Sequence, residues 1–253
     1  MGILSVVVLT LNEEANIGPC LESVRWADEL LVLDSGSTDR TQAIAREYTP
    51  HVLQVEWKGY GGTRNLGLDR ARGDWILWLD ADERVPEELG REIRAVVAGG
   101  GTDAAAYDVA RRAYFLGTWI RHCGWYPGRV TRLFRRGSAR FNDARVHEQL
   151  VVQGRVESLR NDLLHYTDPD LEHYFRKFNR YTTLAAEELH AAGRKAGAWD
   201  LSVRPLFAFL KMYILRLGVL DGLHGFILCV LSAAYVFTKY AKLWERTHAG
   251  GVR

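Results

Sequence analysis

The first hundred residues alternate between short apolar runs and longer stretches in which apolar side chains recur at helical spacing. Short apolar runs rich in β-branched residues are typical of strands buried on both faces of a sheet. These runs are Ile3–Leu9, Leu30–Leu33, Val52–Val55 and Trp75–Leu79. The helical stretches are Ala15–Arg25, Thr41–Glu47, Thr63–Ala71 and Glu87–Val97, the last with Pro86 in its first turn. Strands that alternate with helices in this way predict a parallel sheet with right-handed crossovers.

The pattern changes after Gly99-Gly100-Gly101, where we expect a boundary. Three later segments are expected to form mixed or antiparallel strands, namely Tyr107–Phe115, Arg129–Arg135 and Val146–Val152. After Pro169 the apolar spacing becomes helical throughout. We therefore expect an α/β domain over residues 1–168 and a helical region over residues 169–253.

The helical region is apolar enough to suggest contact with a membrane. Leu171–Ala192 is expected to be one long helix, and Pro205 opens an apolar stretch that reaches Trp244. Its most continuous part, Leu223–Phe237, has about 15 residues, fewer than the roughly 20 that a spanning helix needs. Apolar helices flanked by Lys, Arg, Tyr and Trp favour attachment to the membrane surface, on the inner face of the cytoplasmic membrane. The alternative is a helical lid or dimer surface on a soluble enzyme.

Composition excludes some classes of protein. Lys and Arg number 33 against 31 Asp and Glu, so the net charge of +2 is too small to indicate a nucleic-acid partner. The three cysteines form no C-x-x-C pair, which fits a reducing cytoplasm better than a zinc site or a disulfide framework. The apolar N-terminus lacks a basic segment and a small-residue cleavage site, so it reads as a strand rather than a signal peptide.

Polar residues cluster where the predicted parallel strands end, and ligands of such sheets bind at this edge. Asp80-Ala81-Asp82 follows the fourth strand. Two carboxylates on one turn can hold Mg²⁺ or Mn²⁺, which in turn neutralises a departing pyrophosphate. Asp34 ends the second strand, where α/β proteins place a carboxylate that reads a nucleoside. The alternatives are a solvated acidic turn and ordinary turn or cap residues.

Two further groups of residues suggest phosphate binding and proton transfer. Lys58 and Arg64-Asn65 flank a glycine-rich loop at a predicted helix start, which favours anions; the alternative is surface charge. The loop is not a Walker A motif, and the absence of G-x-G-x-x-G argues against a dehydrogenase. His147-Glu148, after Asp143, could supply a metal ligand and the general base, although neighbours on a strand point opposite ways.

Four segments in this order resemble the family-2 inverting glycosyltransferases of the GT-A fold: SVVVLTLNEEANI, VLDSGSTDRT, GYGGTRNLGL and WILWLDADERV. Further segments are similar to the branch that acts in lipopolysaccharide core synthesis: WYPGRVTRLFRR, FNDARVHEQL, the LLHY around His165, and FTKYAKLWE. The resemblance covers nearly the whole chain. It implies a GT-A, Rossmann-like sheet with a C-terminal helical extension. It also implies transfer of glucose or another hexose from a UDP-sugar to a lipid-linked acceptor such as the lipopolysaccharide inner core.

The resemblance also implies roles for individual residues. The donor would be bound by Thr10, Leu11, Asn12, Glu13, Asp34, Ser35, Lys58, Arg64, Asn65, Asp80 and Ala81. Asp82 and His147 would hold the metal, with Glu148 or Asp143 as the base. Acceptor contacts are expected from Trp125, Tyr126, Arg129 and Arg132, for which a packed aromatic loop beside a basic strand is the alternative. Three departures stand out: Leu11 replaces a frequent Tyr, Ser35 replaces a frequent second Asp, and the usual late Glu-Asp motif is absent.

The expected partners are therefore a UDP-sugar, a lipid-linked saccharide, a divalent Mg²⁺ or Mn²⁺ ion and the membrane surface, with a homo-oligomer as a further possibility. Two other functions remain open from the sequence. A sugar-phosphate nucleotidyltransferase would also use an α/β nucleotide domain and a carboxylate-held metal, although it normally has a basic glycine-rich loop where this chain has the acidic LNEE. A noncatalytic, membrane-bound scaffold with a vestigial nucleotide pocket is the second.

Overall fold

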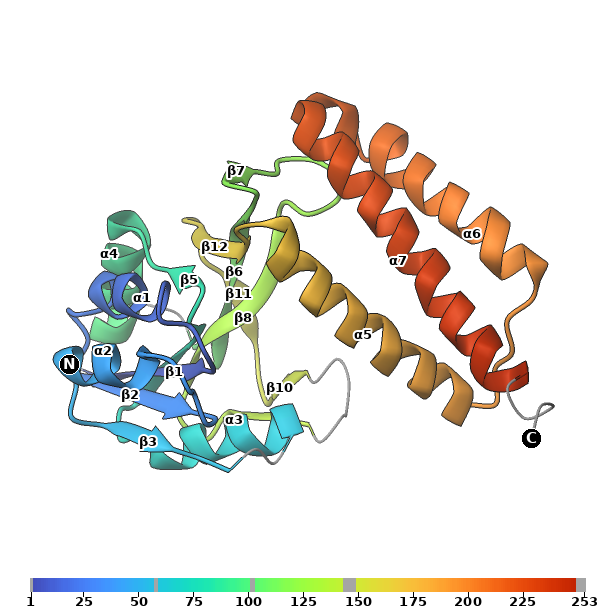
Figure 1. Cartoon of the computed structure of the whole chain (residues 1–253). Coiled ribbons are helices and arrows are strands. Elements are labelled where there is room, and N and C mark those ends of the chain that lie inside the picture. Colours follow the sequence, from blue (N-terminus) through green and yellow to red (C-terminus); the bar gives the residue numbers. More distant parts are fainter. Residues whose placement is uncertain (1, 57–58, 101–102, 143–148, 249–253) are drawn as a thin grey trace. The chain divides into compact units, whose positions relative to one another are not determined.

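The computed structural model of the chain describes residues 2–56, 59–100, 103–142 and 149–248 (Figure 1). The chain forms two compact units. Unit 1 comprises Met1–Arg112 and Gly128–His165, and unit 2 comprises Ala113–Pro127 and Tyr166–Arg253. The excursion Ala113–Pro127 thus belongs with the helices of unit 2, and the expected division into residues 1–168 and 169–253 stays a prediction.

The first half of unit 1 has the predicted parallel sheet. Its strands are β1 (Leu4–Thr10), β2 (Glu29–Asp34), β3 (Val52–Gln54) and β4 (Trp75–Asp80). They pair in parallel in the order β3-β2-β1-β4. The helices between and after them are α1 (Ile17–Ser23), α2 (Thr41–Tyr48), α3 (Gly59–Arg70) and α4 (Glu87–Ala95), with Pro86 as the N-cap of α4. The alternation predicted from the sequence is confirmed.

The sheet continues beyond β4 with antiparallel strands. β8 (Gly128–Arg135) pairs with β4, and β6 (Ala106–Phe115) pairs with β8. β12 (Leu163–Asp168) and the short β5 (Glu83–Arg84) complete the order β8-β6-β12-β5. The minor strands are β7 (Thr118–Trp119), β11 (Val156–Ser158), and the pair β9 (Ala139–Phe141) and β10 (Leu150–Val152). The change of pattern expected at the glycine run is therefore present: after the short π-helical segment η1 (Val96–Gly100), the chain adds mixed strands to the same sheet.

The core of unit 1 lies on both faces of the parallel strands, because their side chains alternate between the two faces. Val6 and Val8 pack with α1, α2 and α4, whereas Val7, between them, packs on the side of α3 and β9. Figure 1 shows α1, α2 and α4 on one side of the sheet and α3 on the other. Burial on both faces explains why these strands read as continuous apolar runs.

Gly67 lies where α3 approaches the sheet most closely. A Cβ atom at this position would lie 2.5 Å from Leu33 Cδ1 and 2.9 Å from Val7 Cγ1. Overpacking of this kind usually costs about 1–3 kcal/mol. We expect Gly67→Ala to lower the free energy of unfolding by roughly that amount in urea titrations. Gly18→Ala is the control, since its Cβ would meet Ile44 at 3.4 Å; equal stability of the two variants would contradict the prediction.

Unit 2 is built on helices. α5 (Leu171–Ala191) matches the long helix predicted from the sequence, and α6 (Ala198–Leu210) and α7 (Gly222–His248) lie side by side, joined by η2 (Lys211–Leu215) and η3 (Gly218–Asp221) (Figure 1). Pro205, at which the predicted apolar stretch begins, lies inside α6. The helix begins earlier because Asp200 accepts a hydrogen bond from the Gly197 N–H and caps its first turn.

The last helix is longer than its most apolar run. Residues Gly218–His248 have a mean hydropathy of 1.8 over their most apolar window, which is only 17% buried. By length and composition alone, this 31-residue segment could cross a membrane. The helix α7 extends past the apolar run Leu223–Phe237 to His248, and the expected attachment to the membrane surface stays a prediction.

Lys242 fastens α7 to α5. Its ammonium group lies within 2.8–3.0 Å of the Asn179 carbonyl and side-chain oxygens and of the Thr182 and Thr183 hydroxyls. Burial lowers the pKa of Lys242 from its usual value. An ammonium donates at most three hydrogen bonds, so these acceptors satisfy it fully.

Candidate active site

The carboxyl ends of β1 and β2 bring Thr10 and Asp34 together in register. Asp34 is fully buried, and its Oδ1 accepts hydrogen bonds from the N–H groups of Gly36 and Ser37 and from Gln42 Nε2, at 2.8–3.0 Å. Within the part of the chain that the structure describes, Asp34 Oδ2 and Thr10 Oγ1 are buried without a hydrogen-bond partner. Unpaired buried oxygens are costly, so both are candidates to bind a ligand.

The loop after β1 is fixed to the loop after β2 by side chains at both ends. The Asn12 N–H donates to Ser37 Oγ, and the Thr38 N–H donates to Asn12 Oδ1, both at 2.8 Å. The Glu13 N–H donates to Thr41 Oγ1 at 2.8 Å. Asn12 has a φ of 53°, a left-handed conformation that Asn tolerates better than most residues. The two loops therefore form one rigid rim beside Asp34.

Leu11 and Ser35 complete this rim. The Leu11 side chain is 44% exposed. The Ser35 N–H and hydroxyl both donate to the Thr10 carbonyl, at 3.0 and 3.2 Å. The structure therefore brings the predicted donor-binding residues that follow β1 and β2 to one place, while their contact with a nucleotide stays a prediction.

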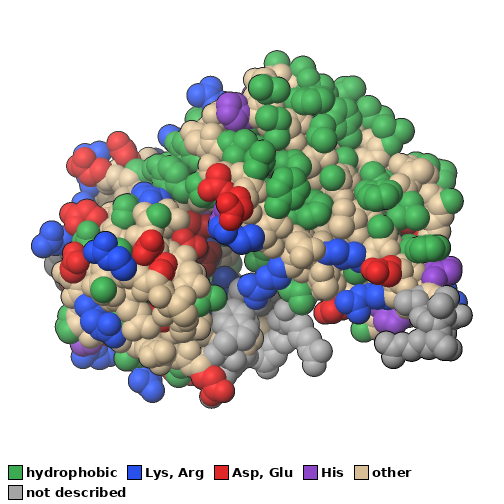
Figure 2. Space-filling model, in the orientation of Figure 1, with side chains coloured by type: hydrophobic (Ala, Val, Ile, Leu, Met, Phe, Trp, Pro, Cys, Tyr) green, Lys and Arg blue, Asp and Glu red, His purple; other side chains and the backbone are tan. Residues whose placement is uncertain are grey.

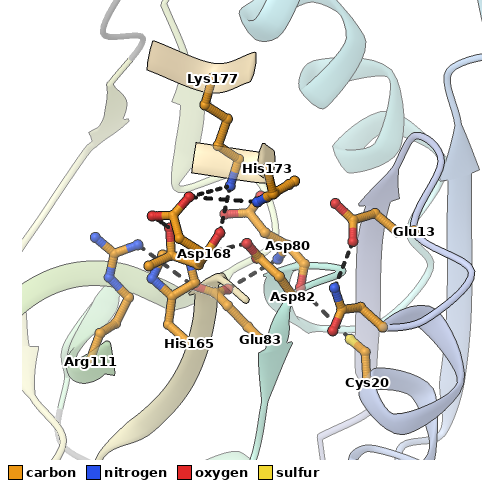
Figure 3. Close-up of polar contacts among 12 residues, drawn as sticks. Glu13, Cys20, Asp80, Asp82, Glu83, Arg111, His165, Asp168, His173 and Lys177 are labelled. Atoms are coloured by element: carbon orange, nitrogen blue, oxygen red, sulfur yellow. Dashed lines mark hydrogen bonds and ion pairs between the residues drawn. The ribbon is translucent and has the colours of Figure 1, made fainter. Parts of the chain in front are cut away.

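A partly buried network of charges, which we call the Asp80 cluster, lies at the end of β4. It consists of Arg64, Asp80, Glu83, Arg111 and Arg132. The Arg132 guanidinium lies 2.6 Å from both Asp80 Oδ2 and Glu83 Oε1, and Arg64 lies 3.3 Å from Asp80 Oδ1. Glu83 is fully buried and also accepts the Asp80 N–H at 3.0 Å. Figure 3 shows Asp80, Glu83 and Arg111 converging from three different strands or turns.

Charge within the Asp80 cluster decides the protonation of its members. Burial raises the pKa of Asp80, but the Arg132 and Arg64 guanidinium groups outweigh it and hold this pKa well below its usual range. Burial raises the pKa of Glu83, and Arg132 offsets this only in part. Burial lowers the pKa of Arg132, but the negative charges of Asp80 and Glu83 outweigh it, so this pKa is raised overall. Asp80 is therefore a fixed anion at neutral pH.

Asp82 points away from this network and toward His165. Asp82 Oδ2 lies 3.3 Å from His165 Nε2, and the two side chains are 15% and 16% exposed. Ala81, between the two aspartates, is buried, and the two carboxylates have different partners: Asp80 pairs with arginines and Asp82 with His165. The sequence did not single out His165 as a ligand. It reaches Asp82 because β12 pairs with β5, where His165 lies opposite Glu83.

The donor set of Asp82 and His165 fits a divalent cation. A carboxylate suits Mg²⁺ or Mn²⁺, and an imidazole nitrogen favours Mn²⁺ or another transition metal over Mg²⁺. Across residues 2–56, 59–100, 103–142 and 149–248, no group of three or more His, Cys, Asp or Glu side chains is arranged to hold a metal. A cation at Asp82 would thus need further oxygen ligands, such as substrate phosphates.

Arg64 and Asn65 differ from the expected arrangement. α3 begins at Gly59, so the expected glycine-rich loop is largely helical and Arg64 lies in the second turn. The guanidinium carbon of Arg64 lies 5.1 Å from the centre of the Phe141 ring. Asn65 forms two hydrogen bonds with the backbone of Phe141, at 2.8 and 2.9 Å. Asn65 therefore holds β9, and both residues' contact with a diphosphate stays a prediction.

The expected acceptor residues fall into two groups. Trp125 and Tyr126 belong to unit 2, where Trp125 packs edge-on against Phe115. Arg129 and Arg132 belong to unit 1. Arg129 is partly exposed and lies 2.7 Å from Asp108, but Arg132 is buried beneath Asp80. Arg132 therefore pairs with Asp80 and Glu83 below the surface, and its expected contact with the acceptor stays a prediction.

Four of the predicted residues lie outside the described part of the chain: Lys58, Asp143, His147 and Glu148. Their roles as phosphate ligand, alternative base, metal ligand and base stay predictions.

Unit 2 contains a second polar group, at the start of α5, which the sequence did not reveal. His173 Nδ1 and Lys177 Nζ lie 3.6 and 3.9 Å from Asp168 Oδ1 (Figure 3). Burial lowers the pKa of His173, and the Lys177 charge lowers it further, against the opposing effect of Asp168. His173 is therefore neutral at physiological pH.

The fold and the site together define a Rossmann-like enzyme of the GT-A type, with acidic residues at the carboxyl edge of its sheet. The family model described as glycosyl transferase family 2 matches residues 5–145. The chain belongs to glycosyltransferase family 2 and is a glycosyltransferase. Family membership confirms the expected fold class and enzyme class, and it disfavours the nucleotidyltransferase and the noncatalytic scaffold.

Individual relatives agree with this assignment. The lipopolysaccharide core biosynthesis glycosyltransferase LpsC of Rhizobium meliloti (strain 1021) is 33% identical over 96% of this chain and 92% of its own length. The uncharacterized glycosyltransferase RT0209 of Rickettsia typhi is 28% identical over 96% of this chain and 87% of its own. S. aureus TarS 1-349, solved in complex with UDP-GlcNAc, has a TM-score of 0.50 at 17% identity over 98% of this chain and 92% of that chain. This last likeness shows the fold alone.

Proposed function

We propose that the chain is an inverting transferase that moves a hexose from a UDP-sugar to a lipid-linked saccharide, such as the lipopolysaccharide inner core. The observation that carries the proposal is the carboxyl edge of the sheet, where a fixed anion, Asp80, stands beside Asp82 and His165. The similarity to LpsC over nearly the whole chain supports the acceptor class.

The donor nucleoside is proposed to bind at the rim of β1 and β2. The unpartnered oxygens Asp34 Oδ2 and Thr10 Oγ1 can accept hydrogen bonds from the N–H of a uracil ring or from ribose hydroxyls. Both side chains are buried, so such bonds would be protected from competing water. Asp80, next along the sheet, is the proposed contact for the ribose.

A divalent cation, Mg²⁺ or Mn²⁺, is proposed at Asp82 and His165, with His147 as a further proposed ligand. When bound, such a cation neutralises the negative charge that develops on the departing diphosphate. The chain's own contribution is to hold Asp82 apart from the Arg132 guanidinium, which is committed to Asp80 and Glu83. Asp82 thus keeps its carboxylate available.

In the proposed reaction, an acceptor hydroxyl oxygen attacks the anomeric carbon of the sugar while the bond from that carbon to the UDP oxygen breaks. The hydroxyl proton passes to a carboxylate, and UDP leaves with the bonding electrons. Glu148 is the proposed base, with Asp143 as the alternative. Trp125, Tyr126 and Arg129 are the proposed acceptor contacts.

The enzyme is further proposed to work at the cytoplasmic face of the membrane, because its acceptor is lipid-linked. The apolar surface of unit 2 supports this location. A possible homo-oligomer stays a prediction.

The test is a transferase assay with the full chain purified in detergent. UDP-, GDP- and dTDP-hexoses are supplied with Mn²⁺, Mg²⁺ or EDTA, and the acceptor is inner-core lipopolysaccharide from a truncation strain. We expect UDP release and a mass increase of one hexose on the acceptor, only with a UDP-sugar and a divalent ion. Equal turnover in EDTA would contradict the proposed role of the metal. Activity with a GDP- or dTDP-sugar alone would contradict the proposed contact with uridine.

Asp34→Asn tests the donor site separately. Asparagine keeps the oxygen that accepts three hydrogen bonds and replaces the unpartnered one by an amide nitrogen. Loss of a hydrogen bond to a charged group costs about 1.5–3 kcal/mol, so we expect the KM for the UDP-sugar to rise roughly 10- to 100-fold. The control is Asp74→Asn, whose exposed carboxylate accepts the Ile3 N–H just before β4 begins, away from the carboxyl edge. A KM equal in the two variants would contradict the role of Asp34.

A further inference from the structure

A pocket lies between α6 and α7 of unit 2. Its volume is about 490 Å³. We call it the α6–α7 pocket; its lining includes Trp199, Arg204, Phe207, Val236, Lys239 and Tyr240. Most of these residues are apolar or aromatic, and two are cations. The pocket therefore combines a wall for hydrocarbon with positive charge.

The two cations of the pocket converge on one aromatic ring. The Arg204 guanidinium carbon and the Lys239 ammonium lie 5.2 and 4.9 Å from the centre of the Tyr240 ring. Arg204 Nε donates to Asp200 Oδ1 at 2.6 Å. Among the residues that the structure describes, Lys239 has no ion pair or hydrogen bond, and burial together with the charge of Arg204 lowers its pKa. Of the two cations, Arg204 pairs with a carboxylate and Lys239 pairs with none of the described ones, so an anion placed between them would be stabilised.

The surface around the pocket is apolar on both helices. Exposed apolar residues of α6 and η2 recur at helical spacing, which places them on one face: Trp199, Leu206, Phe207, Leu210 and Ile214. Those of α7 recur in the same way: Leu223, Phe226, Val230, Phe237 and Trp244. Figure 2 shows hydrophobic side chains gathered over this unit. Large exposed apolar patches mark sites of interaction with membranes or with other proteins.

We propose that the α6–α7 pocket binds the phosphate of an anionic glycerophospholipid, whose acyl chains lie against the exposed apolar faces of α6 and α7. The site extends the membrane attachment proposed above and does not depend on which sugar is transferred. An anionic lipid complements both features of this surface: its phosphate is negative, as the two cations require, and its acyl chains can cover the exposed apolar side chains. A second copy of the chain is disfavoured as the occupant because it would bring the same cations to this face.

Vesicle flotation of the full chain tests the proposal. Vesicles of phosphatidylcholine are compared with vesicles in which roughly a third of the lipid is phosphatidylglycerol, whose anionic surface attracts basic residues. Each basic residue near an anionic surface contributes about fivefold to partitioning, so we expect Arg204→Gln/Lys239→Gln to reduce binding to the anionic vesicles at least about 20-fold. Binding to the neutral vesicles should change little.

Arg194→Gln/Lys195→Gln is the matched control. It removes the same two charges from exposed positions just before α6, outside the pocket. Equal losses in the pocket variant and the control would show that only general surface charge matters, and this result would overturn the proposal. So would a pocket variant that binds anionic vesicles as the parent chain does.

Lipid binding can also be measured without vesicles, on the chain kept in detergent, where a less stable variant can still be compared. Native mass spectrometry of the detergent-solubilised chain counts bound phospholipids directly. We expect one tightly bound phosphatidylglycerol in the parent chain, no comparable phosphatidylcholine, and loss of the bound lipid in Tyr240→Leu, which keeps an apolar wall. UDP binding is measured on the same samples by calorimetry. Lost lipid with intact UDP binding separates this site from the proposed transferase site, and retained lipid in both pocket variants would refute it.

Discussion

Replacing Asp82 with asparagine should abolish nearly all sugar transfer while unit 1 stays folded. The Asp82 carboxylate takes no part in the Asp80 cluster and faces only His165 among its described ion-pair partners. Removing its charge would weaken a bound cation just where the diphosphate departs. Charge stabilisation of this kind is worth several kcal/mol, so we expect kcat to fall about 100- to 1,000-fold. The measurement is UDP release at saturating donor and Mn²⁺.

Asp69→Asn is the control for this loss. Asp69 is an exposed carboxylate of α3 that pairs with Arg140 at 2.9 Å, so its removal takes the same charge from unit 1 without touching the site. Both variants should melt within a few degrees of the parent chain. His165→Gln should raise the Mn²⁺ concentration needed for half-maximal activity. If Asp82→Asn keeps the turnover of the parent chain, the proposal that Asp82 holds the metal is contradicted.

The second large effect concerns stability. Arg132→Met should lower the free energy of unfolding by about 3–5 kcal/mol, because it leaves Asp80 and the fully buried Glu83 without their shared cation. Thermal melting of unit 1, followed by tryptophan fluorescence, measures the loss. The effect should depend on pH. Arg132 and Arg64 lower the pKa of Asp80, so the stability they contribute is complete above its ordinary pKa of 3.8 and is lost as the pH falls below it.

Arg129→Met provides the comparison on the same strand. Arg129 pairs with Asp108 at the surface, and exposed pairs usually contribute less than about 1 kcal/mol. The gap in the free energy of unfolding between the two variants should therefore be full at pH 7 and begin to decrease as the pH falls below about 3.8. A constant gap across that range would show that Arg132 stabilises the fold through packing of its side chain rather than through its charge.

The parallel half of the sheet could be predicted because its signal is local. The strands β1, β2 and β4 are buried on both faces, so each appears as an apolar run, and each crossover helix shows its own spacing. The carboxyl edge follows from the parallel arrangement, which is why Asp34, Asp80 and Asp82 could be predicted to share one rim. Family membership was recognisable for the same reason, since these motifs follow the strand ends.

The remainder of the site depends on pairing between distant segments. His165 reaches Asp82 only because a two-residue strand, β5, pairs with β12, and two residues carry no periodic pattern. Glu83 looks like part of an acidic surface turn in the sequence. Its burial depends on Arg132, which lies 49 residues further along the chain. A buried carboxylate needs a cation to offset its charge, and the sequence does not show which distant arginine provides it.

The excursion Ala113–Pro127 has a consequence for the order in which the chain is made. Its apolar residues Ile120 and Cys123 are covered by α7, and Cys123 Sγ lies 3.6 Å from Cys229 Sγ, which emerges from the ribosome 106 residues later. At a translation rate of about 5–20 residues per second, the excursion Ala113–Pro127 stays uncovered by α7 for roughly 5–20 s. Unit 1 ends at His165 and needs nothing from α7 for its own core, so the nascent sheet can form first. The apolar side of Ala113–Pro127 is therefore covered only after α7 has been made, so unit 2 closes later than the core of unit 1 can form.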